Sequence, residues 1–163
     1  MDRTWYTYCK SPVGRLLLVA NEKGLQFIGF PEGKMVRRPE PGWQADPARF
    51  SKAIRQLDAY FAGRLREFDL ELAPQGTPFQ LAVWRQLQAV PYGTTVSYGE
   101  IARRIGNADA VRAVGAANGR NPLPIVVPCH RVIGSDGRLT GYGGGLHVKE
   151  ALLALERQHA LKA

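Results

Sequence analysis

The hydrophobic pattern changes character halfway along the 163 residues, and this change constrains the fold more than any other feature. In the first half, short apolar or β-branched runs at 4–8, 15–20 and 25–30 are separated by turn sequences at 11–14 and 21–24. Such spacing predicts a meander of antiparallel strands. The second half instead carries repeated helix-start signals, so the two halves are expected to fold differently.

The rest of the first half predicts a loop, a helix and one more strand. The segment 31–47 holds four prolines and two glycines, which is typical of an irregular loop. Apolar residues then recur at helical spacing from Phe50 to Phe61, and Gly63 is the expected stop. A strand over 67–72 could close the sheet.

Three helix starts follow in the second half. Thr77 and Gln80 have the spacing of a capping box and predict a helix that runs to about residue 87. Ser97 and Glu100 form a second such box, for a helix that ends at Gly106. Asp109 is the expected cap of a third helix over 110–118.

The last two of these helices, joined by a tight turn, have the outline of a helix-turn-helix. The second of them offers alanines, one glycine and Arg112, with almost no side chain that could read a base edge in the major groove. Such a smooth helix suits a sequence-blind contact in the minor groove, where a side chain can enter the base stack. The same small residues would equally permit tight packing inside the core.

The overall fold predicted is α+β. A small antiparallel-sheet domain over 1–75 precedes a mostly helical domain over 76–163. No apolar run approaches the roughly 20 residues that cross a bilayer, and the start of the chain lacks a secretory pattern, so we expect a cytoplasmic protein. The two cysteines, Cys9 and Cys129, are expected to be free thiols in that reducing compartment.

The balance of charge favours a polyanionic partner. Lysine and arginine total 22 against 14 acidic residues, which gives a formal charge of +8. Charge of this size is also found in basic domains that are merely soluble. Its distribution is more informative, because all the basic residues between 101 and 138 are arginines, which suit phosphate contacts and stacking.

The candidate chemistry lies in one short run, where apolar residues 125–127 lead through Pro128 to Cys129, His130 and Arg131. A thiolate nucleophile needs a nearby base. Adjacent residues on an extended strand point to opposite sides, so Cys129 and His130 need a bridging water or a turn at Pro128. The acid that orients the histidine could be Glu150 or Glu156, and spacing does not choose between them.

A glycine-rich segment over 141–145 follows, with Tyr142 inside it. It lacks the Lys-Ser or Lys-Thr pair of a phosphate-binding loop. It suits instead a flexible wall that closes over a flat ligand.

The run Pro128-Cys129-His130-Arg131-Val132, the glycine run and the preceding helix-turn-helix together resemble the O6-alkylguanine-DNA alkyltransferase family. The resemblance spans nearly the whole chain. It implies a ribonuclease-H-like first domain and a winged-helix-like second domain. It also implies irreversible, single-turnover transfer of an alkyl group from O6-alkylguanine to Cys129, with the target nucleotide flipped out of the duplex and with O4-alkylthymine left open as a second substrate.

Residue by residue, the resemblance makes Cys129 the alkyl acceptor, His130 the group that takes its proton through a water, and Glu156 the orienting acid. Asn121 matches the hinge between helix-turn-helix and active site. Tyr98 matches the tyrosine at the flipped nucleotide, Arg112 the side chain that fills the gap in the stack, and Tyr142 with Gly143 the wall around the guanine. The full set of expected DNA- and substrate-binding residues is Tyr98, Arg112, Ala113, Ala117, Pro124, Arg131, Val132, Tyr142 and Gly143.

The expected partner is double-stranded DNA that contains O6-alkylguanine. The protein is expected to be a monomer without a membrane contact, with cooperative clustering on DNA left as an alternative. No cofactor is expected, and zinc is disfavoured because Cys9 is the only cysteine of the first half and no histidine precedes His130. Gly143 stands where some relatives have serine, so an O6 contact there would come from backbone.

Three other functions are compatible with parts of the sequence. A non-catalytic sensor of alkylated guanine would share the DNA-binding features, but relatives of that type replace the cysteine. A cysteine hydrolase would leave the helix-turn-helix and Arg112 unexplained. A helix-turn-helix regulator is disfavoured by the lack of base-reading side chains.

Overall fold

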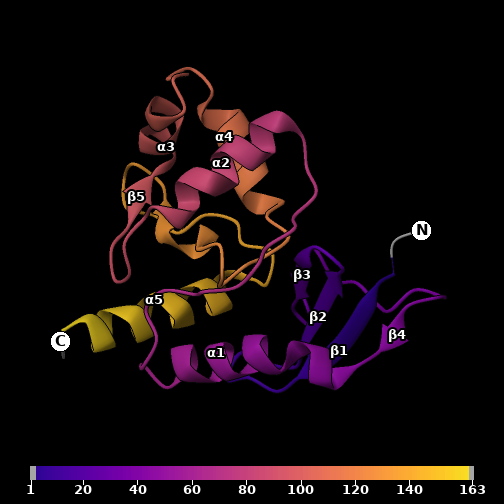
Figure 1. Cartoon of the computed structure of the whole chain (residues 1–163). Coiled ribbons are helices and arrows are strands. Elements are labelled where there is room, and N and C mark those ends of the chain that lie inside the picture. The colour runs from indigo at the N-terminus through magenta and orange to yellow at the C-terminus, as the bar shows by residue number, and fades with distance from the viewer. Residues whose placement is uncertain (1–2, 162–163) are drawn as a thin grey trace.

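The first half of the chain forms a four-stranded sheet in the computed structural model, which describes residues 3–161 (Figure 1). Strands β1 (Trp5–Cys9), β2 (Leu16–Asn21) and β3 (Gly24–Gly29) make the predicted antiparallel meander. The expected loop over 31–47 contains a short strand, β4 (Gln44–Ala45), which pairs parallel with β1. The sheet order is therefore β3-β2-β1-β4, and the sheet is mixed rather than purely antiparallel.

The prediction of a strand over 67–72 was wrong. This segment forms a single parallel bridge, between Leu25 and Leu72, with backbone hydrogen bonds of 2.9 Å from Leu25 to Glu71 and 2.7 Å from Ala73 to Leu25. Pro74 follows at once and has no N–H to continue a ladder. The free edge of β3 is covered further along by Pro122, whose carbonyl accepts from the amide of Ile28 at 2.8 Å.

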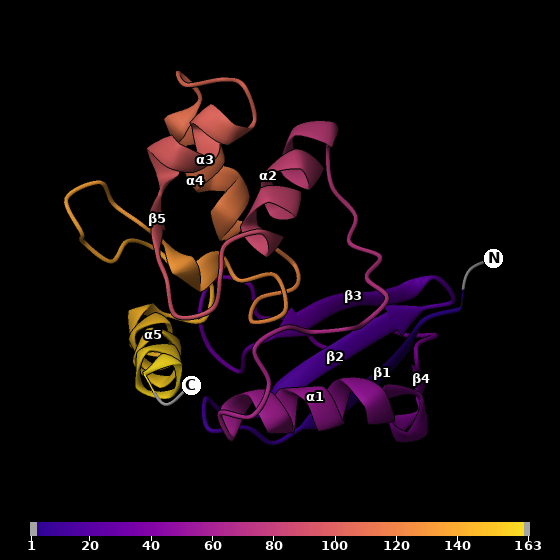
Figure 2. The same ribbon diagram turned by 60° about the vertical axis from the view of Figure 1, so that its left-hand side comes forward.

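One face of the sheet is covered by helix α1 (Ser51–Phe61), which follows a short 3₁₀ turn, η1 (Pro47–Phe50) (Figure 2). The predicted helix is confirmed, with Leu57 buried and Ile54 and Phe61 partly buried, while the helix buries Ala53 and Tyr60 in addition. The loop before β4 covers the other face, where Met35 and Trp43 pack over a small apolar cluster on β2 and β3.

The second half is mostly helical, as predicted. Thr77 caps α2 through a complete capping box. Its hydroxyl accepts from the amide of Gln80 at 3.1 Å, and its own amide donates to the side-chain oxygen of Gln80 at 3.0 Å. Ser97 also accepts from the amide of Glu100, at 3.1 Å, but the Glu100 carboxylate pairs with Arg103 and Arg104. The elements in order are α2 (Pro78–Gln88), β5 (Val96–Ser97), α3 (Tyr98–Arg104), α4 (Val111–Gly119), η2 (Cys129–Arg131), β6 (Val132–Ile133) and α5 (Leu146–Ala160).

The predicted cap at Asp109 was wrong. Ala110 occupies the N-cap position of α4, and no side chain caps that helix. Helices α3 and α4 nevertheless pack on each other across a short connection, as a helix-turn-helix requires. None of the helices within residues 3–161 is long and apolar enough to cross a membrane.

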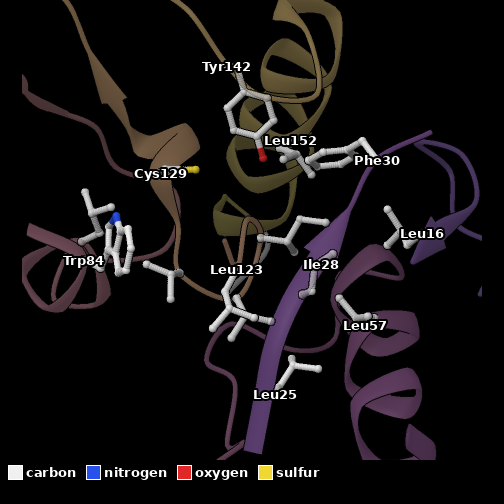
Figure 3. Close-up of a cluster of buried hydrophobic side chains, with 14 of the residues drawn as sticks. Leu16, Leu25, Ile28, Phe30, Leu57, Trp84, Leu123, Cys129, Tyr142 and Leu152 are labelled. Carbon is white, nitrogen blue, oxygen red and sulfur yellow. The ribbon is translucent and has the colours of Figure 1, made fainter. Parts of the chain in front are cut away.

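A single apolar core joins the two halves. Leu25 and Ile28 of the sheet share one buried cluster with Leu123, Leu152 and the side chain at position 129 (Figure 3). Helix α5 lies near the C-terminal end of α1 and beneath the helices of the second half, and it bonds to Tyr60 and Arg66 of the first half as well as packing on η2 (Figures 1 and 2). The two halves therefore share packed interior at these residues.

A backbone hydrogen bond also joins two loops across the seam between the halves. The amide of Lys34 donates to the carbonyl of Gly143 at 3.0 Å, and Gly33 beside it has a φ of +107°. A Cβ at Gly33 would overlap that carbonyl oxygen. Only glycine therefore lets the 31–36 loop lie this close to the glycine-rich segment.

Gly33→Ala should lower the free energy of unfolding in urea by more than Gly42→Ala does. Both glycines have positive φ, but a Cβ at Gly42 meets nothing within 4 Å. Gly42→Ala therefore reports left-handed strain alone, about 1–2 kcal/mol, and Gly33→Ala adds the displaced contact with Gly143. Equal losses in the two variants would contradict this close packing.

Candidate active site

Cys129 begins a 3₁₀ turn, not the extended strand from which its geometry was first predicted. Pro128 takes a φ of −79° and a ψ of 65°, and its carbonyl accepts from the amide of Arg131 at 3.0 Å. The strand begins only at Val132. A turn at Pro128 was one of the two ways in which neighbouring cysteine and histidine side chains could cooperate, and the structure adopts it.

Asn121 holds the segment that leads into this turn. Its side-chain amide donates to the carbonyl of Val127 at 2.8 Å, and its oxygen accepts from the amide of Leu123 at 3.0 Å. Between them, Ile125 has a φ of +76°, which is a costly conformation for a β-branched residue. The tethered loop fixes where the chain enters Cys129.

The Cys129 thiol is buried, with 4% of the residue exposed. Burial raises the pKa of Cys129 to about 11, and the hydrogen bond from Asn121 and the charge of Lys149 only partly oppose that rise. The Tyr142 hydroxyl lies toward the sulfur and also favours the thiolate (Figure 3). The resting group is therefore a neutral thiol.

His130 is fully buried and its ring is fixed by Glu156. Nε2 lies 2.5 Å from Oε2 of Glu156, and Nδ1 has no hydrogen-bond partner within residues 3–161. Because a carboxylate can only accept, Nε2 carries the proton and Nδ1 presents its lone pair. Burial lowers the pKa of His130 although Glu156 opposes the change, so the ring is neutral at neutral pH and can act as a base.

Glu156 accepts five hydrogen bonds and is fully buried. Burial by itself would raise its pKa, but the hydrogen bonds from His130 and Arg131 and the positive charge of Arg131 hold the pKa of Glu156 far below its usual range. The carboxylate is therefore ionised at neutral pH. Glu150, the other candidate acid, is exposed on α5.

Two hollows with shared lining residues lie near the sulfur, and Cys129 itself lines the inner one. The inner one, of about 20 Å³, is lined by Cys129, Asn121 and Pro124, and has room for about one water. The outer one, of about 470 Å³, lies between α4 and the glycine-rich segment and is lined by Tyr98 and Arg120. Tyr142, Gly143 and Gly119 border both hollows and so separate the thiol from the outside.

Tyr98 and α4 form the outer part of the site. The Tyr98 hydroxyl lies 2.6 Å from that of Thr140, and burial raises the pKa of Tyr98, so it remains a phenol. On α4, Arg112, Ala113 and Ala116 are exposed, and Ala116 lines the outer hollow. For these positions, this exposure favours a role in surface contact over packing inside the core.

Comparison with known proteins identifies the family. The 6-O-methylguanine DNA methyltransferase ribonuclease-like domain matches residues 4–74, and the DNA-binding domain of the same family matches residues 78–158. A methylated-DNA–protein-cysteine methyltransferase from Methanosarcina acetivorans is 53% identical over 93% of this chain and 97% of its own length. The chain belongs to the 6-O-methylguanine DNA methyltransferase family.

Other relatives agree with this assignment. The Mycobacterium tuberculosis protein of the same description is 52% identical over 95% of this chain and 93% of its own length. The crystal structure of Mycobacterium tuberculosis OGT in complex with DNA superposes with a TM-score of 0.90 at 51% identity, covering 95% of this chain and 94% of that one. The predicted fold class, with its ribonuclease-like first domain and helical second domain, is therefore confirmed for this methyltransferase.

The structure buries five of the expected DNA- or substrate-binding residues, namely Ala117, Pro124, Arg131, Val132 and Tyr142. Val132 is fully buried, and Ala117 is 3% exposed, with its carbonyl accepting from the indole of Trp84 at 2.8 Å. The guanidinium of Arg131 is held by Glu156, at 2.8 and 3.0 Å, and by the carbonyl of Val90. In this structure the side chains of Ala117, Arg131 and Val132 support the site from inside, and their contact with DNA or substrate stays a prediction.

Two functional residues escaped the sequence analysis. Lys149 is fully buried, and its ammonium donates to the carbonyls of Val132 at 2.6 Å and Thr140 at 3.1 Å. It lies seven residues before Glu156, on a helix face that is otherwise apolar, and that spacing could have revealed it. Tyr60, which donates to Glu156, sits in an ordinary apolar stripe and left no signal.

Alkylation of Cys129 by iodoacetamide in a Cys9→Ser variant should accelerate steadily from about pH 7 to pH 10, because only the thiolate reacts and most of it forms near the raised pKa. Mass spectrometry of the Cys129 peptide gives the rate. The urea-unfolded variant, with an ordinary thiol, should level off near pH 9. A folded-state plateau below pH 8 would mean that the thiol is already ionised at rest.

Proposed function

We propose that Cys129 accepts the alkyl group from O6 of guanine in double-stranded DNA, once per molecule, in the repair reaction of this family. The observation that carries the proposal is the buried thiol of Cys129 on a small hollow, with the ring of its sequence neighbour His130 fixed by Glu156. The two free cysteines suit a reducing compartment, and we place the reaction in the cytoplasm, with the protein acting as a monomer.

The reaction requires a thiolate only while the substrate is bound. The thiol proton moves through a water to Nδ1 of His130, and Glu156 stabilises the imidazolium that forms. The sulfur then attacks the alkyl carbon, forming an S–C bond as the C–O6 bond breaks. A proton delivered to the guanine ring balances the one lost by the thiol, and Tyr98 is a phenol that can donate toward the ring.

The alkyl carbon is out of reach while the nucleotide is stacked, so the nucleotide must leave the duplex at a cost of a few kcal/mol. Arg112 is exposed on the helix that borders the outer hollow, and it would occupy the gap left in the stack. The inner hollow is smaller than a base. Tyr142 and Gly143 must therefore yield when guanine enters, and the glycines of the 141–145 segment suit that movement.

The resulting thioether has no good leaving group, so the modified protein should not turn over. Pro124 and the backbone at Gly143 line the route to the sulfur and would contact the base. Gly143 has no side chain to offer O6, and only its backbone can contribute a hydrogen bond there.

Mixing the protein with a duplex that contains one O6-methylguanine should replace one hydrogen of each chain by a methyl group, as read from the intact mass. Peptide mapping should locate the methyl on Cys129. Cys9→Ser should behave as the unaltered protein, and Cys129→Ser should gain no methyl. Protein that binds the lesion tightly yet keeps its original mass would contradict transfer and favour the sensor.

A further inference from the structure

The sheet half of the chain contributes a hydroxyl to the active-site network. Tyr60 of α1 donates to Oε2 of Glu156 at 2.6 Å, and both side chains are fully buried. The phenol must be the donor, because Glu156 is ionised and burial raises the pKa of Tyr60 far above its ordinary value. Tyr60 and Glu156 are 96 residues apart, so only the folded seam brings them together.

This approach is built into the contact between α1 and α5. Gly63, just past α1, has a φ of +76°, and a Cβ there would overlap the ring of His159 on α5. Arg66 then donates to the carbonyl of His159 at 3.0 Å. The helices are therefore held close by contacts that do not involve the Tyr60 hydroxyl.

The oxygen that Tyr60 contacts is the one that holds the histidine. Oε2 also accepts from His130 at 2.5 Å and from Arg131 at 3.0 Å, while Oε1 accepts from Arg131 and from the amide of Gly93. Each donor draws negative charge toward itself, so less remains to stabilise a proton on the imidazole. A third donor on Oε2 also limits the directions in which that oxygen can present its lone pairs.

We propose that Tyr60 is a positioning residue of the active site, which holds Oε2 of Glu156 and reduces the basicity of His130 through it. The inference rests on the proposed role of His130 as the base in alkyl transfer. It means that the first domain does more than support the second, because it supplies one donor of the network that controls proton removal from Cys129.

The groups that can influence His130 come from several elements, so the test must separate Tyr60 from them. Tyr60 packs edge-on against Tyr92, with ring centroids 6.2 Å apart, and the Tyr92 hydroxyl has no hydrogen-bond partner within residues 3–161. Tyr92→Phe therefore removes a buried hydroxyl from the same cluster without breaking a bond to Glu156. The ionisable and charged side chains around His130 and its carboxylate partner are Tyr60 from α1, Lys149 and Glu156 from α5, Cys129 and Arg131 from η2, and Arg66, Tyr92 and Tyr142 from the loops.

The test is the pH dependence of the single-turnover rate of methyl transfer from the O6-methylguanine duplex. The rate should fall on the acid side as His130 becomes protonated. Tyr60→Phe should move that acid limb upward by roughly 0.5–1 pH unit, because Glu156 then stabilises the imidazolium more strongly. Tyr92→Phe should leave the limb where it is in the unaltered protein.

Site-specific 3-fluorotyrosine at position 60 gives a second measurement should the phenylalanine variant not fold. The fluorinated phenol is nearly isosteric and a stronger donor, so it should move the acid limb downward. The role of Tyr60 would be overturned if neither substitution at position 60 moved the acid limb of the pH–rate profile. It would also be overturned if the limb moved only as far as it does in Tyr92→Phe. Either result would leave alkyl transfer intact. No methyl transfer by the unaltered protein would overturn the proposed function instead.

Discussion

The carboxylate of Glu156 is the point on which the structure of the active site depends. An ionised carboxylate sealed from water costs several kcal/mol unless donors surround it, and here they come from α1, from the loop after α2 and from η2. Removing any of these segments would leave a buried charge underpaired. The active site is therefore complete only when both halves are in place, with α5 as the shared element.

The chemistry that results differs from that of an enzyme with a permanently ionised cysteine. Burial keeps the thiol and imidazole neutral at rest, and the carboxylate supplies stabilisation only when the proton moves. A neutral thiol is also a poor target for oxidants, since susceptibility follows thiolate character and exposure. That property suits a protein whose cysteine is used once, because any oxidised molecule is lost before it can act.

Local sequence signals predicted the elements that depend on local physics. The three long strands, the apolar side of α1 and the Thr77 capping box all came from spacing within a few residues. Features that depend on packing between distant segments were missed or misplaced. The 67–72 strand stops after one bridge, and Arg131 turns inward because Glu156 lies beside it in space rather than in sequence.

The site shows the same division. The Cys129–His130 pair marked the chemistry directly, whereas Glu156 was selected over Glu150 only by family resemblance. Burial now separates the two acids, because Glu156 is fully buried and Glu150 is exposed. The left-handed Ile125 could not be predicted, since that conformation is disfavoured for its residue type and is imposed by the Asn121 tether.

The protonation pattern of the His130 ring tests the central claim most directly. Nitrogen-15 NMR of labelled protein at neutral pH, with exposed His147 as an internal reference, distinguishes the two ring nitrogens. The Glu156 contact predicts a neutral ring with the proton on Nε2 and an unprotonated Nδ1. A proton on Nδ1, alone or on both nitrogens, would contradict the assignment of His130 as the base prepared for Cys129.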